Sequence, residues 1–498
     1  MCLAAVIVLV CASCDGSGEE EITVYEEETE AVIPGGSLSV PYYSTDSLNP
    51  FYCETVLNCA LTSLTYRYLY TLDTSFEAVK DMALSESLSG LVLKVYINPD
   101  LVFSDGSALT AADVKYSFDC AKYSDRYKAT LAGISGCYRE SDSCAVFELK
   151  AEDVNVINCL TFPIVKNGTA ADSDALPTGN GFYQYSRDGI RLSLKANLRY
   201  AGDLPDIGTV RLTDVKGNAS PENLVGTQEI DFCYSDLSDA DTSGVNCSAT
   251  GIYLNNLVYM GVNHANVNLV LASFRQAISF GIDRTSLSDN AFMGYARAAA
   301  VPFNTSWSGY AKSLSASSVS LTADTAKTQQ LLSERAFGVD GHPLDLVLVC
   351  NEGNAFIRNT ANEIAAALAP CNINITVRLL SSSDLKKAVQ SGAYDLYIAE
   401  IKLPANMDLS EFFSYGGAAS YGMIFDNLTC DEAYFSYKKG EISLDDFIMS
   451  FNKDMPFIPL AYRNGRFLYT RDVTSELTAS EGFFFKGIDG LTFSETRF

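Results

Sequence analysis

Histidine and tryptophan are scarce in this sequence of 498 residues, which has two histidines, His264 and His342, and one tryptophan, Trp307. Catalysis by a Ser-His-Asp or Cys-His arrangement needs a histidine, and most catalytic zinc sites need several. Both histidines lie in turn-like contexts, MGVNHANV and DGHPLD, where we expect structural or exposed roles. The composition therefore argues against a metal site built on several histidines.

Basic residues are also few, with 35 Lys and Arg against 61 Asp and Glu, a net charge of −26. Nucleic-acid binding needs a basic surface, so no nucleic-acid partner is expected. The patterns GxSxG, HExxH and the P-loop are missing as well, as is CxxC after Cys14, and no cofactor or metal is expected. With 47% hydrophobic residues the chain is typical of a globular protein, and its length predicts two to four domains.

The apolar run at the beginning is too short to span a membrane. It comprises residues 3–12, LAAVIVLVCA, whereas a spanning helix needs roughly 20 residues. Together with the following Ser-Cys it resembles the lipobox of bacterial lipoproteins, with Cys14 as the acylated residue, although Cys11 stands where leucine is usual. We expect residues 1–14 to be a lipoprotein signal peptide; a plain secretory signal is the alternative. Because no Lys or Arg precedes Arg67, we also expect translation to begin upstream.

Residues 15–34, DGSGEEEITVYEEETEAVIP, are rich in Gly, Ser and Glu. Such a segment buries too little apolar area to offset its ordering entropy, which predicts an acidic flexible tether. Signal, cysteine and tether together predict an extracytoplasmic protein anchored to the bacterial cell membrane as a lipoprotein.

The remaining cysteines mostly lie in apolar contexts that favour packing in a core, such as Cys120 in FDCAK and Cys350 in LVLVC. Cys137 and Cys144 differ because they flank the polar segment YRESDS between two strand-like runs. The sequence predicts that this pair forms a short disulfide outside the cell.

Local patterns predict a mixed α/β protein. In FSDGSALTAADVKYSF, Asp105-Gly106 indicates a turn, and Thr110 with Asp113 approximates a capping box at the start of a helix. Further strands are expected over LSVPYY, 91–97, 144–149, 189–200 and 207–215, and helices over 54–72 and 268–284. From residue 342, strand LDLVLVC, helix 355–369, strand INITVRLL, helix 383–391 and strand YDLYIAEI form a βαβαβ pattern, typical of a parallel sheet.

Six segments, in order, resemble elements of the extracytoplasmic solute-binding proteins of ABC importers, in the family that binds oligopeptides, dipeptides and nickel. FSDGSALTAADVKYSF resembles its aromatic-x-Asp-Gly signature followed by Leu-Thr-Ala-x-Asp-Val. FRQAISFGIDR resembles its Val-Arg-Gln-Ala-Ile helix, and MPFIPLAY its late Pro-x-Ile-Pro-Leu segment. The others are SLNPFY, GAYDLYIAEI and LPTGNGFYQY, which keeps Gly179 and Gly181 of a Gly-Thr-Gly-Pro-Tyr turn. The resemblance covers roughly residues 35–498.

This resemblance implies a periplasmic-binding-protein-like α/β fold with two lobes around a ligand cleft and an additional α+β domain. Lobe I would comprise residues 35–52, 179–262 and 464–498, the additional domain residues 53–178, and lobe II residues 263–463. The resemblance also implies a non-catalytic monomer that captures oligopeptides or a related small solute and delivers them to ABC permease subunits.

Peptide binders of this family hold the α-ammonium of the peptide with an Asp that lies shortly before a segment matching DLSEFF here. Ala405 stands near that anchoring position, so the expected carboxylate is missing. Asp408 remains a candidate ligand contact, although its position favours capping the helix that follows.

Three aromatic residues are further candidates for substrate binding. Trp307 lies in VPFNTSWSGY, in an expected ligand-facing loop, although a core position fits the sequence equally well. Tyr421, in GGAASYGMIF, is a similar case. Tyr42 and Tyr43 end the first predicted strand, and alternation directs one of them inward; Tyr43 is our candidate.

Two other functions remain open at this point. A cell-surface hydrolase that uses paired carboxylates has no short motif and would be distinguished by a hydrolysis screen. A ligand sensor would use the same cleft without transport.

Overall fold

The computed structural model describes residues 35–215, 220–237, 245–313, 320–475 and 478–494. The predicted signal peptide, Cys14 and the acidic tether lie outside the described residues. The described chain contains three large hydrophobic cores, and the first of them draws residues from two β-sheets.

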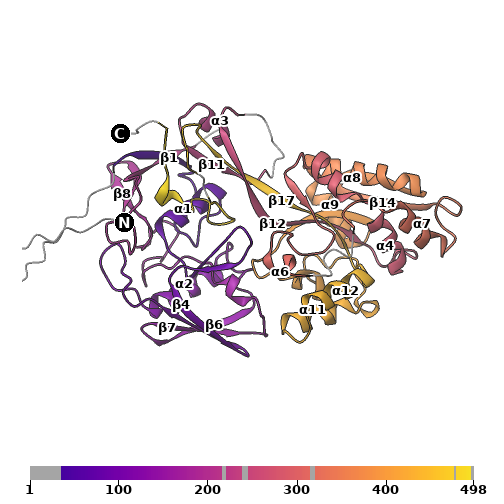
Figure 1. Cartoon of the computed structure of the whole chain (residues 1–498), viewed down its shortest axis with the longest axis horizontal. Helices are drawn as coiled ribbons and strands as arrows, with labels where there is room; N and C mark the ends of the chain where they lie inside the picture. The colour runs from indigo at the N-terminus through magenta and orange to yellow at the C-terminus, as the bar shows by residue number, and fades with distance from the viewer. Residues whose placement is uncertain (1–34, 216–219, 238–244, 314–319, 476–477, 495–498) are drawn as a thin grey trace, which may run out of the picture. The chain divides into compact units, whose positions relative to one another are not determined.

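The first core lies against a four-stranded sheet with the order β1-β10-β9-β8 (Figure 1). Its strands are β1 (Ser37–Tyr42), β8 (Tyr183–Asp188), β9 (Arg191–Ala196) and β10 (Thr209–Asp214). The strand expected over 189–200 is shorter, because Gly189 adopts φ +57° and turns the chain between β8 and β9. Helix α1 (Val56–Thr65) contributes Leu61 and Leu64 to this core, although the expected boundary at residue 53 assigns it to the additional domain.

The second core lies between a sheet with the order β4-β5-β7-β6 and helix α2 (Ala111–Tyr123). The strands are β4 (Ala83–Ser89), β5 (Val92–Ile97), β6 (Ile134–Ser141) and β7 (Cys144–Leu149). The capping box is confirmed: the Thr110 hydroxyl accepts at the first turn of α2, and Asp113 accepts from the Thr110 N–H at 2.8 Å. A small hairpin, β2 (Tyr70–Leu72) and β3 (Ala78–Lys80), and the 3-10 turn η1 (Val156–Cys159) accompany it.

The predicted disulfide between Cys137 and Cys144 is wrong, and both residues are free thiols. Strands β6 and β7 do form a hairpin, but Cys137 lies opposite Phe147, whereas Cys144 lies opposite Ser141. Side chains alternate between the two faces of a strand, so Cys137 joins Phe147 in the second core. Cys144 points to the other face, where its Sγ lies 3.4 Å from the Glu140 carboxylate.

The third core lies on a seven-stranded sheet with the order β11-β17-β12-β16-β14-β15, to which β13 adds at β17. The strands are β11 (Phe232–Ser235), β12 (Ser248–Val262), β13 (Ala296–Ala298), β14 (Leu344–Asn351), β15 (Ile373–Leu380), β16 (Leu396–Lys402) and β17 (Ile458–Tyr469). The predicted βαβαβ unit is confirmed, because β14 is parallel to both β15 and β16.

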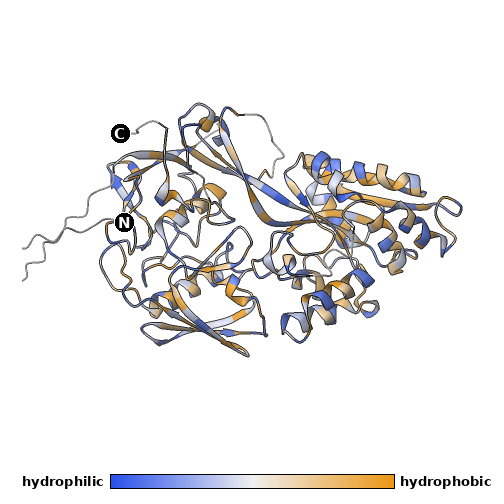
Figure 2. Ribbon diagram, in the orientation of Figure 1, coloured by the Kyte–Doolittle hydropathy of each residue, from blue (hydrophilic) through white to orange (hydrophobic). Residues whose placement is uncertain are grey.

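Helices cover the sheet of the third core and account for the remaining apolar residues. They are α4 (Ala272–Phe280), α7 (Thr325–Ser333), α8 (Ala355–Leu368), α9 (Ser382–Ser391), α11 (Cys430–Lys438) and α12 (Leu444–Asp454). Shorter helices are α3 (Pro221–Gly226), α5 (Arg284–Ser286), α6 (Ser308–Ala311) and α10 (Ser410–Phe413). Hydrophobic and hydrophilic residues alternate along α11 and α12 (Figure 2), and α12 buries Phe447, Ile448 and Phe451.

Strands β12 and β17 connect the first core with the third. In β12, Ile252 and Leu254 belong to the first core, whereas Leu257 and Val258 belong to the third. The pairing of β12 with β17 shifts register between Tyr253 and Leu257, at the junction of the two cores. A bulge bends a strand locally, so we expect a hinge at this junction and refer to it below as the hinge.

Candidate functional site

The segment after β16, residues 403–409, lies at a switch point of the largest sheet; we call it the β16 loop. The chain places β15 on one side of β14 and then crosses back to place β16 on the other side. In open α/β sheets, ligands bind outside the carboxyl ends of strands at such a point. The topology therefore singles out the β16 loop before any side chain is considered.

Two buried asparagine side chains hold this loop from different parts of the chain. Asn255, on β12, donates its Nδ2 to the carbonyls of Leu403 at 3.1 Å and Pro404 at 3.0 Å. Asn158, in η1 of the second core, donates its Nδ2 to the carbonyls of Phe76 at 3.1 Å and Ala405 at 3.4 Å. The backbone of the loop is thus tied both to the hinge strand and to the second core.

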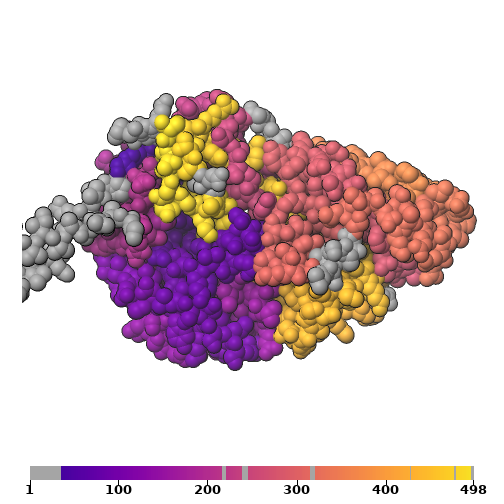
Figure 3. Space-filling model, viewed as in Figure 1, coloured from indigo at the N-terminus to yellow at the C-terminus, as the bar shows by residue number. Residues whose placement is uncertain are grey.

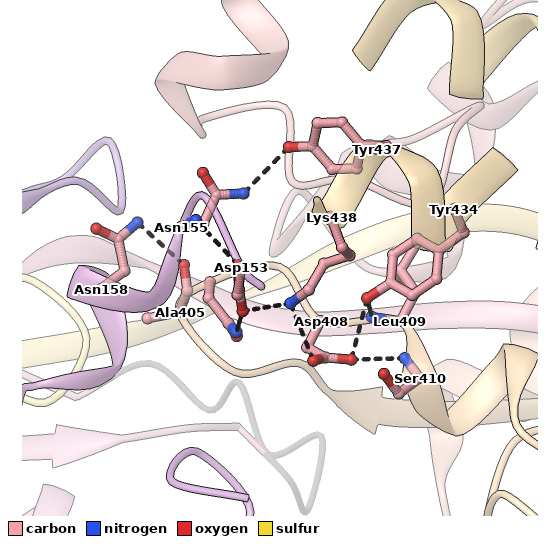
Figure 4. Close-up of polar contacts among 11 residues, drawn as sticks. Asp153, Asn155, Asn158, Ala405, Asp408, Leu409, Ser410, Tyr434, Tyr437 and Lys438 are labelled. Carbon is pink, nitrogen blue, oxygen red and sulfur yellow. Dashed lines mark hydrogen bonds and ion pairs between the residues drawn. The ribbon is translucent and has the colours of Figure 1, made fainter. Parts of the chain in front are cut away.

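Lys438, at the end of α11, connects the second core with the third through two carboxylates (Figure 4). Its Nζ lies 3.1 Å from Asp408 Oδ2 and also binds Asp153 Oδ2, and only 10% of the lysine side chain is exposed. The Val154 N–H donates to the Lys438 carbonyl at 3.1 Å, and Asn406 donates to Asp153 at 2.7 Å. This ion-paired group, Asp153, Asp408 and Lys438, is called the lysine clamp below.

The electrostatics of the lysine clamp favour the charged forms of Asp408 and Lys438. Burial by itself would raise the pKa of Asp408, but the Lys438 ammonium and hydrogen bonds from Ser410 outweigh it and lower the pKa. Burial would likewise lower the pKa of Lys438, but the two carboxylates raise it. Tyr434 adds a hydroxyl that donates to Asp408 Oδ1 at 3.0 Å. A buried ammonium between two carboxylates is stable only while all partners are in place.

A cavity of about 370 Å³ opens beside the lysine clamp, between the second core and the β16 loop. Its walls come from residues 129–134 and 149–159 on one side and from the β16 loop and α11 on the other, including Lys150, Pro404, Asn406, Asp408 and Lys438. Figure 3 shows the surface of the second core in contact with the surface of the C-terminal helices α11 and α12. The volume is that of a pocket for a small organic molecule.

A second cavity, of about 280 Å³, lies on the hinge side and is lined by Asp73, Thr74, Tyr253, Ser480 and Glu481. Glu481 accepts from the Asn255 N–H at 2.8 Å, and its Oε1 lies 2.6 Å from Lys402 Nζ. The Glu481 side chain is 12% exposed, whereas that of Lys402 is 66% exposed and extends into solvent. The carboxyl end of β16 therefore presents an ion pair whose lysine remains accessible.

Tyr253, which lines this second cavity, stacks on a cation. The Arg297 guanidinium lies 3.9 Å from the centre of the Tyr253 ring. The same guanidinium donates to Asn304 Oδ1 at 2.7 Å, so it is fixed in position. Arg297 and Tyr253 offer a planar, polar surface next to the hinge.

Asp408 is the predicted site residue that lies at the cavity, and it does not act as the N-cap of α10. Leu409 occupies the N-cap position of α10, and no side chain caps this helix. Asp408 accepts a hydrogen bond from the Ser410 N–H at 2.6 Å. It also forms the ion pair with Lys438 and accepts a hydrogen bond from the Tyr434 hydroxyl. Ala405, which stands at the expected anchoring position, packs against Tyr68, Leu72 and Phe483.

The structure does not bring the three aromatic candidates together with Asp408. Trp307 is 3% exposed in the third core, with its ring 5.5 Å from that of Phe303, so the core alternative describes its position. Tyr43 packs beside Leu57 and Cys233 and lines a separate cavity of about 350 Å³.

Tyr421 lies at the amino end of β16 rather than at its carboxyl end. The carbonyl of the next residue, Gly422, accepts from the N–H of His264, just after β12 ends. A Cβ added at Gly422 would contact the Tyr394 hydroxyl, just before β16 begins. The seven residues of β16 separate this position from the β16 loop by about 20 Å.

Reasoning from the sequence missed the residues that connect the parts of the chain. Lys438, Asp153, Asn158, Asn255 and Glu481 lie far apart in the sequence and carry no local motif. Lys402 was an available signal, because it places a charge directly after the predicted strand YDLYIAEI. His264 has the expected structural role: it is 1% exposed and its Nε2 lies 3.0 Å from the Pro456 carbonyl.

Metal binding has no cluster to support it in the described part of the chain. Among the described residues, no group of three or more His, Cys, Asp and Glu side chains is placed to hold an ion.

Comparison with known proteins gives one consistent result. The family model for bacterial extracellular solute-binding proteins, family 5 Middle, matches residues 77–420. The oligopeptide-binding protein AppA of Bacillus subtilis is 23% identical over 426 residues, which cover 78% of this chain and 77% of that protein. The nickel-binding protein NikA of Staphylococcus aureus is 24% identical over 300 residues, 57% of this chain and 58% of that protein. The structure of the substrate-binding protein CtaP of Listeria monocytogenes aligns with a TM-score of 0.70 at 18% identity, over 93% of this chain and 100% of that chain.

Proposed function

Since this chain belongs to the bacterial extracellular solute-binding proteins of family 5, with their periplasmic-binding-protein-like fold, we propose that it binds its solute around the β16 loop. The chain is the extracytoplasmic solute-binding subunit of an ABC importer, whose partners are a peptide or small solute and permease subunits. The domain limits inferred from the sequence are part of this proposal, except that α1 is grouped with lobe I.

The observation that carries the proposal is the convergence of strand β12, the second core and α11 on the β16 loop. Asn255 reaches it from the hinge strand, Asn158 from the second core, and Lys438 from α11. A hinge at the β12–β17 register shift would let the second and third cores separate and close again around a solute. The cavity that the loop lines and the second cavity, lined by Tyr253 and Glu481, supply the space.

The proposed solute is an oligopeptide or a related small organic molecule. AppA, by its name, binds oligopeptides. Ala405 offers no carboxylate for a free α-ammonium, and its methyl group is packed against Tyr68, Leu72 and Phe483. Glu481 instead lines the hinge cavity and pairs with the exposed Lys402, so it is positioned to attract a cationic group when Lys402 turns away.

Mass spectrometry of small molecules released by denaturing the purified protein tests this proposal. The recovered molecule is then titrated against Glu481→Gln, which should weaken binding at least tenfold, and against Glu441→Gln as a control. Glu441 forms an exposed ion pair with Lys439 at 3.8 Å, so its substitution should leave Kd unchanged. Equal affinity of both variants would place the solute elsewhere.

The absence of catalysis and a monomeric state are further parts of the proposal. Incubating the recovered solute with the protein should return it intact, whereas cleavage would favour the carboxylate-based hydrolase. Genes for a permease and an ATPase beside this one would support transport over a sensor that uses the same cleft.

Anchoring at Cys14 completes the proposed function. In the described part of the chain, no helix combines the length and the hydropathy that a bilayer crossing requires. We expect diacylglyceryl modification of Cys14, so that protein made from the full upstream start partitions into detergent and Cys14→Ser releases it. Equal partitioning of both forms would contradict the lipid anchor.

A further inference from the structure

Two cysteines near the start of α1 lie in direct contact. Cys53 Sγ and Cys59 Sγ are 3.3 Å apart, which is close enough for one thiol to donate a hydrogen bond to the other. A disulfide has an S–S distance of about 2.05 Å, so closure needs an approach of little more than 1 Å. Among the cysteines that the structure describes, all are free thiols.

Hydrogen bonds fix the backbone around both cysteines, on either side of the gap between their sulfur atoms. The Cys53 N–H donates to the Asn49 carbonyl at 3.0 Å, in a tight turn. The Asp46 carboxylate accepts from the N–H and the hydroxyl of Thr55, the N-cap residue of α1, and Cys59 lies in the first turn of that helix. The contact between the sulfurs is therefore a consequence of a fixed turn followed by a helix.

A cation from a distant part of the chain faces this pair. Arg126 Nη1 lies 3.4 Å from Cys53 Sγ and 3.5 Å from Thr62 Oγ1. Within the described residues Arg126 forms no ion pair with a carboxylate. A guanidinium in this position stabilises a thiolate, the form of cysteine that reacts with disulfides.

We propose that Cys53 and Cys59 are a thiol–disulfide site, which closes to an intramolecular disulfide by exchange with an external disulfide in the extracytoplasmic space. Solute-binding proteins of this family work outside the cytoplasmic membrane, where disulfides form and persist. This site is separate from the β16 loop and does not depend on the proposed solute.

The two thiols have different roles in the exchange. The hydrogen bond from Cys53, together with Arg126, outweighs burial and lowers the pKa of Cys59 to about 7. The same hydrogen bond and burial raise the pKa of Cys53. Cys59 is also the more exposed of the two, since Cys53 is only 4% exposed. Cys59 is thus the attacking group, and Cys53 resolves the intermediate.

The reaction is a balanced exchange. The Cys59 thiolate attacks one sulfur of the external disulfide, and a mixed disulfide forms as the other half leaves as a thiolate. Cys53 then gives up its proton and attacks Cys59 Sγ, which releases the second half as a thiolate. The pair loses two electrons and two protons, and the external disulfide becomes two thiols.

The surroundings give the resolving thiol a cavity, which Cys59 does not line, and give the disulfide a structural consequence. Cys53 lines a cavity of about 610 Å³, together with Phe51, Tyr116, Cys120 and Arg126. Phe51 belongs to the second core, whereas Leu61, on α1, belongs to the first. A disulfide would tie the turn that carries Phe51 to the helix that carries Leu61, and so would join the two cores at their chain crossing.

Peptide mapping of exported protein, alkylated without reductant, tests the site. Cleavage after Glu54 puts Cys53 and Cys59 on separate peptides, which should be recovered linked and should separate on reduction. Reduced protein should relink these peptides when treated with oxidised glutathione. Alkylation of both cysteines in the exported protein and after this treatment would overturn the proposal.

Single substitutions test the order of events. With oxidised glutathione, Cys53→Ser should trap a stable mixed disulfide at Cys59, whereas Cys59→Ser should react at least tenfold more slowly at Cys53. Cys120→Ser, in the same cavity wall, should leave the linked peptides unchanged. Equal rates in the two single variants would contradict the roles assigned to Cys59 and Cys53. Loss of the link in Cys120→Ser would contradict the disulfide between Cys53 and Cys59.

Discussion

At the scale of single residues, Lys438 links the second and third cores through two carboxylates. Lys438→Met would leave the Asp153 and Asp408 carboxylates buried without their cation, and we expect a loss of about 3 kcal/mol in the free energy of unfolding at pH 7. Lys439→Met, at the exposed neighbour, should change it by less than about 0.5 kcal/mol. Urea unfolding of the three proteins measures both differences.

The same residues give a pH dependence with a defined sign. Because the folded-state pKa of Asp408 is lowered, its carboxylate stabilises the fold above its unfolded pKa, about 3.9, and this contribution is lost as the pH falls through the folded value. In Lys438→Met the unpaired carboxylates should have raised pKa values. Acidification toward pH 4 should protonate them and so reduce the destabilisation of the variant. The difference from wild type should therefore shrink between pH 7 and pH 4.5; a constant difference would show that lost packing is the cause.

For Trp307, a role in solute binding and a role in core packing predict opposite effects of substitution on stability and affinity. Its ring is buried in the third core beside Phe303, so Trp307→Ala should cost about 3–5 kcal/mol in the free energy of unfolding. Trp307→Phe should cost clearly less because it retains most of the apolar volume. Urea unfolding followed by circular dichroism measures both. A stable Trp307→Ala protein that no longer binds the released solute would instead restore Trp307 to the site.

At the scale of elements, the start of α2 depends on its capping box. Thr110 and Asp113 satisfy N–H groups that the first turn of α2 leaves without partners. Thr110→Ala should therefore lower the free energy of unfolding by about 1 kcal/mol, whereas Thr110→Ser should be nearly neutral because the hydroxyl is kept. Urea unfolding decides this, and equal losses in both variants would assign the effect to the Thr110 methyl group.

At the scale of the whole molecule, Phe76 joins the second and third cores. It lies in the turn between β2 and β3 at φ +57°, and its ring is 2% exposed within the third core. Phe76→Ala should cost about 3 kcal/mol and should let the two cores separate more readily. Hydrogen exchange in residues 73–77 and 403–409 should accelerate, with a larger radius of gyration by X-ray scattering. Val79→Ala, at an exposed residue of β3, should change neither quantity.

Local order was predictable because it depends on neighbours in the chain. The capping box at Thr110, the βαβαβ unit from residue 342 and the structural role of His264 are all confirmed. Each follows from turn chemistry or from apolar periodicity within a short window. The same windows carried the family resemblance, so the fold and the general function followed from the sequence as well.

Which side chains meet was decided only by the tertiary structure. Cys137 and Cys144 are near in sequence but lie on opposite faces of a hairpin, whereas Cys53 meets Cys59 and faces Arg126 from another segment. Lys438 forms an ion pair with Asp153, which lies 285 positions away in the sequence. A short window contains neither the register of a sheet nor the packing of one core on another, and these two properties set the long-range contacts that build the site.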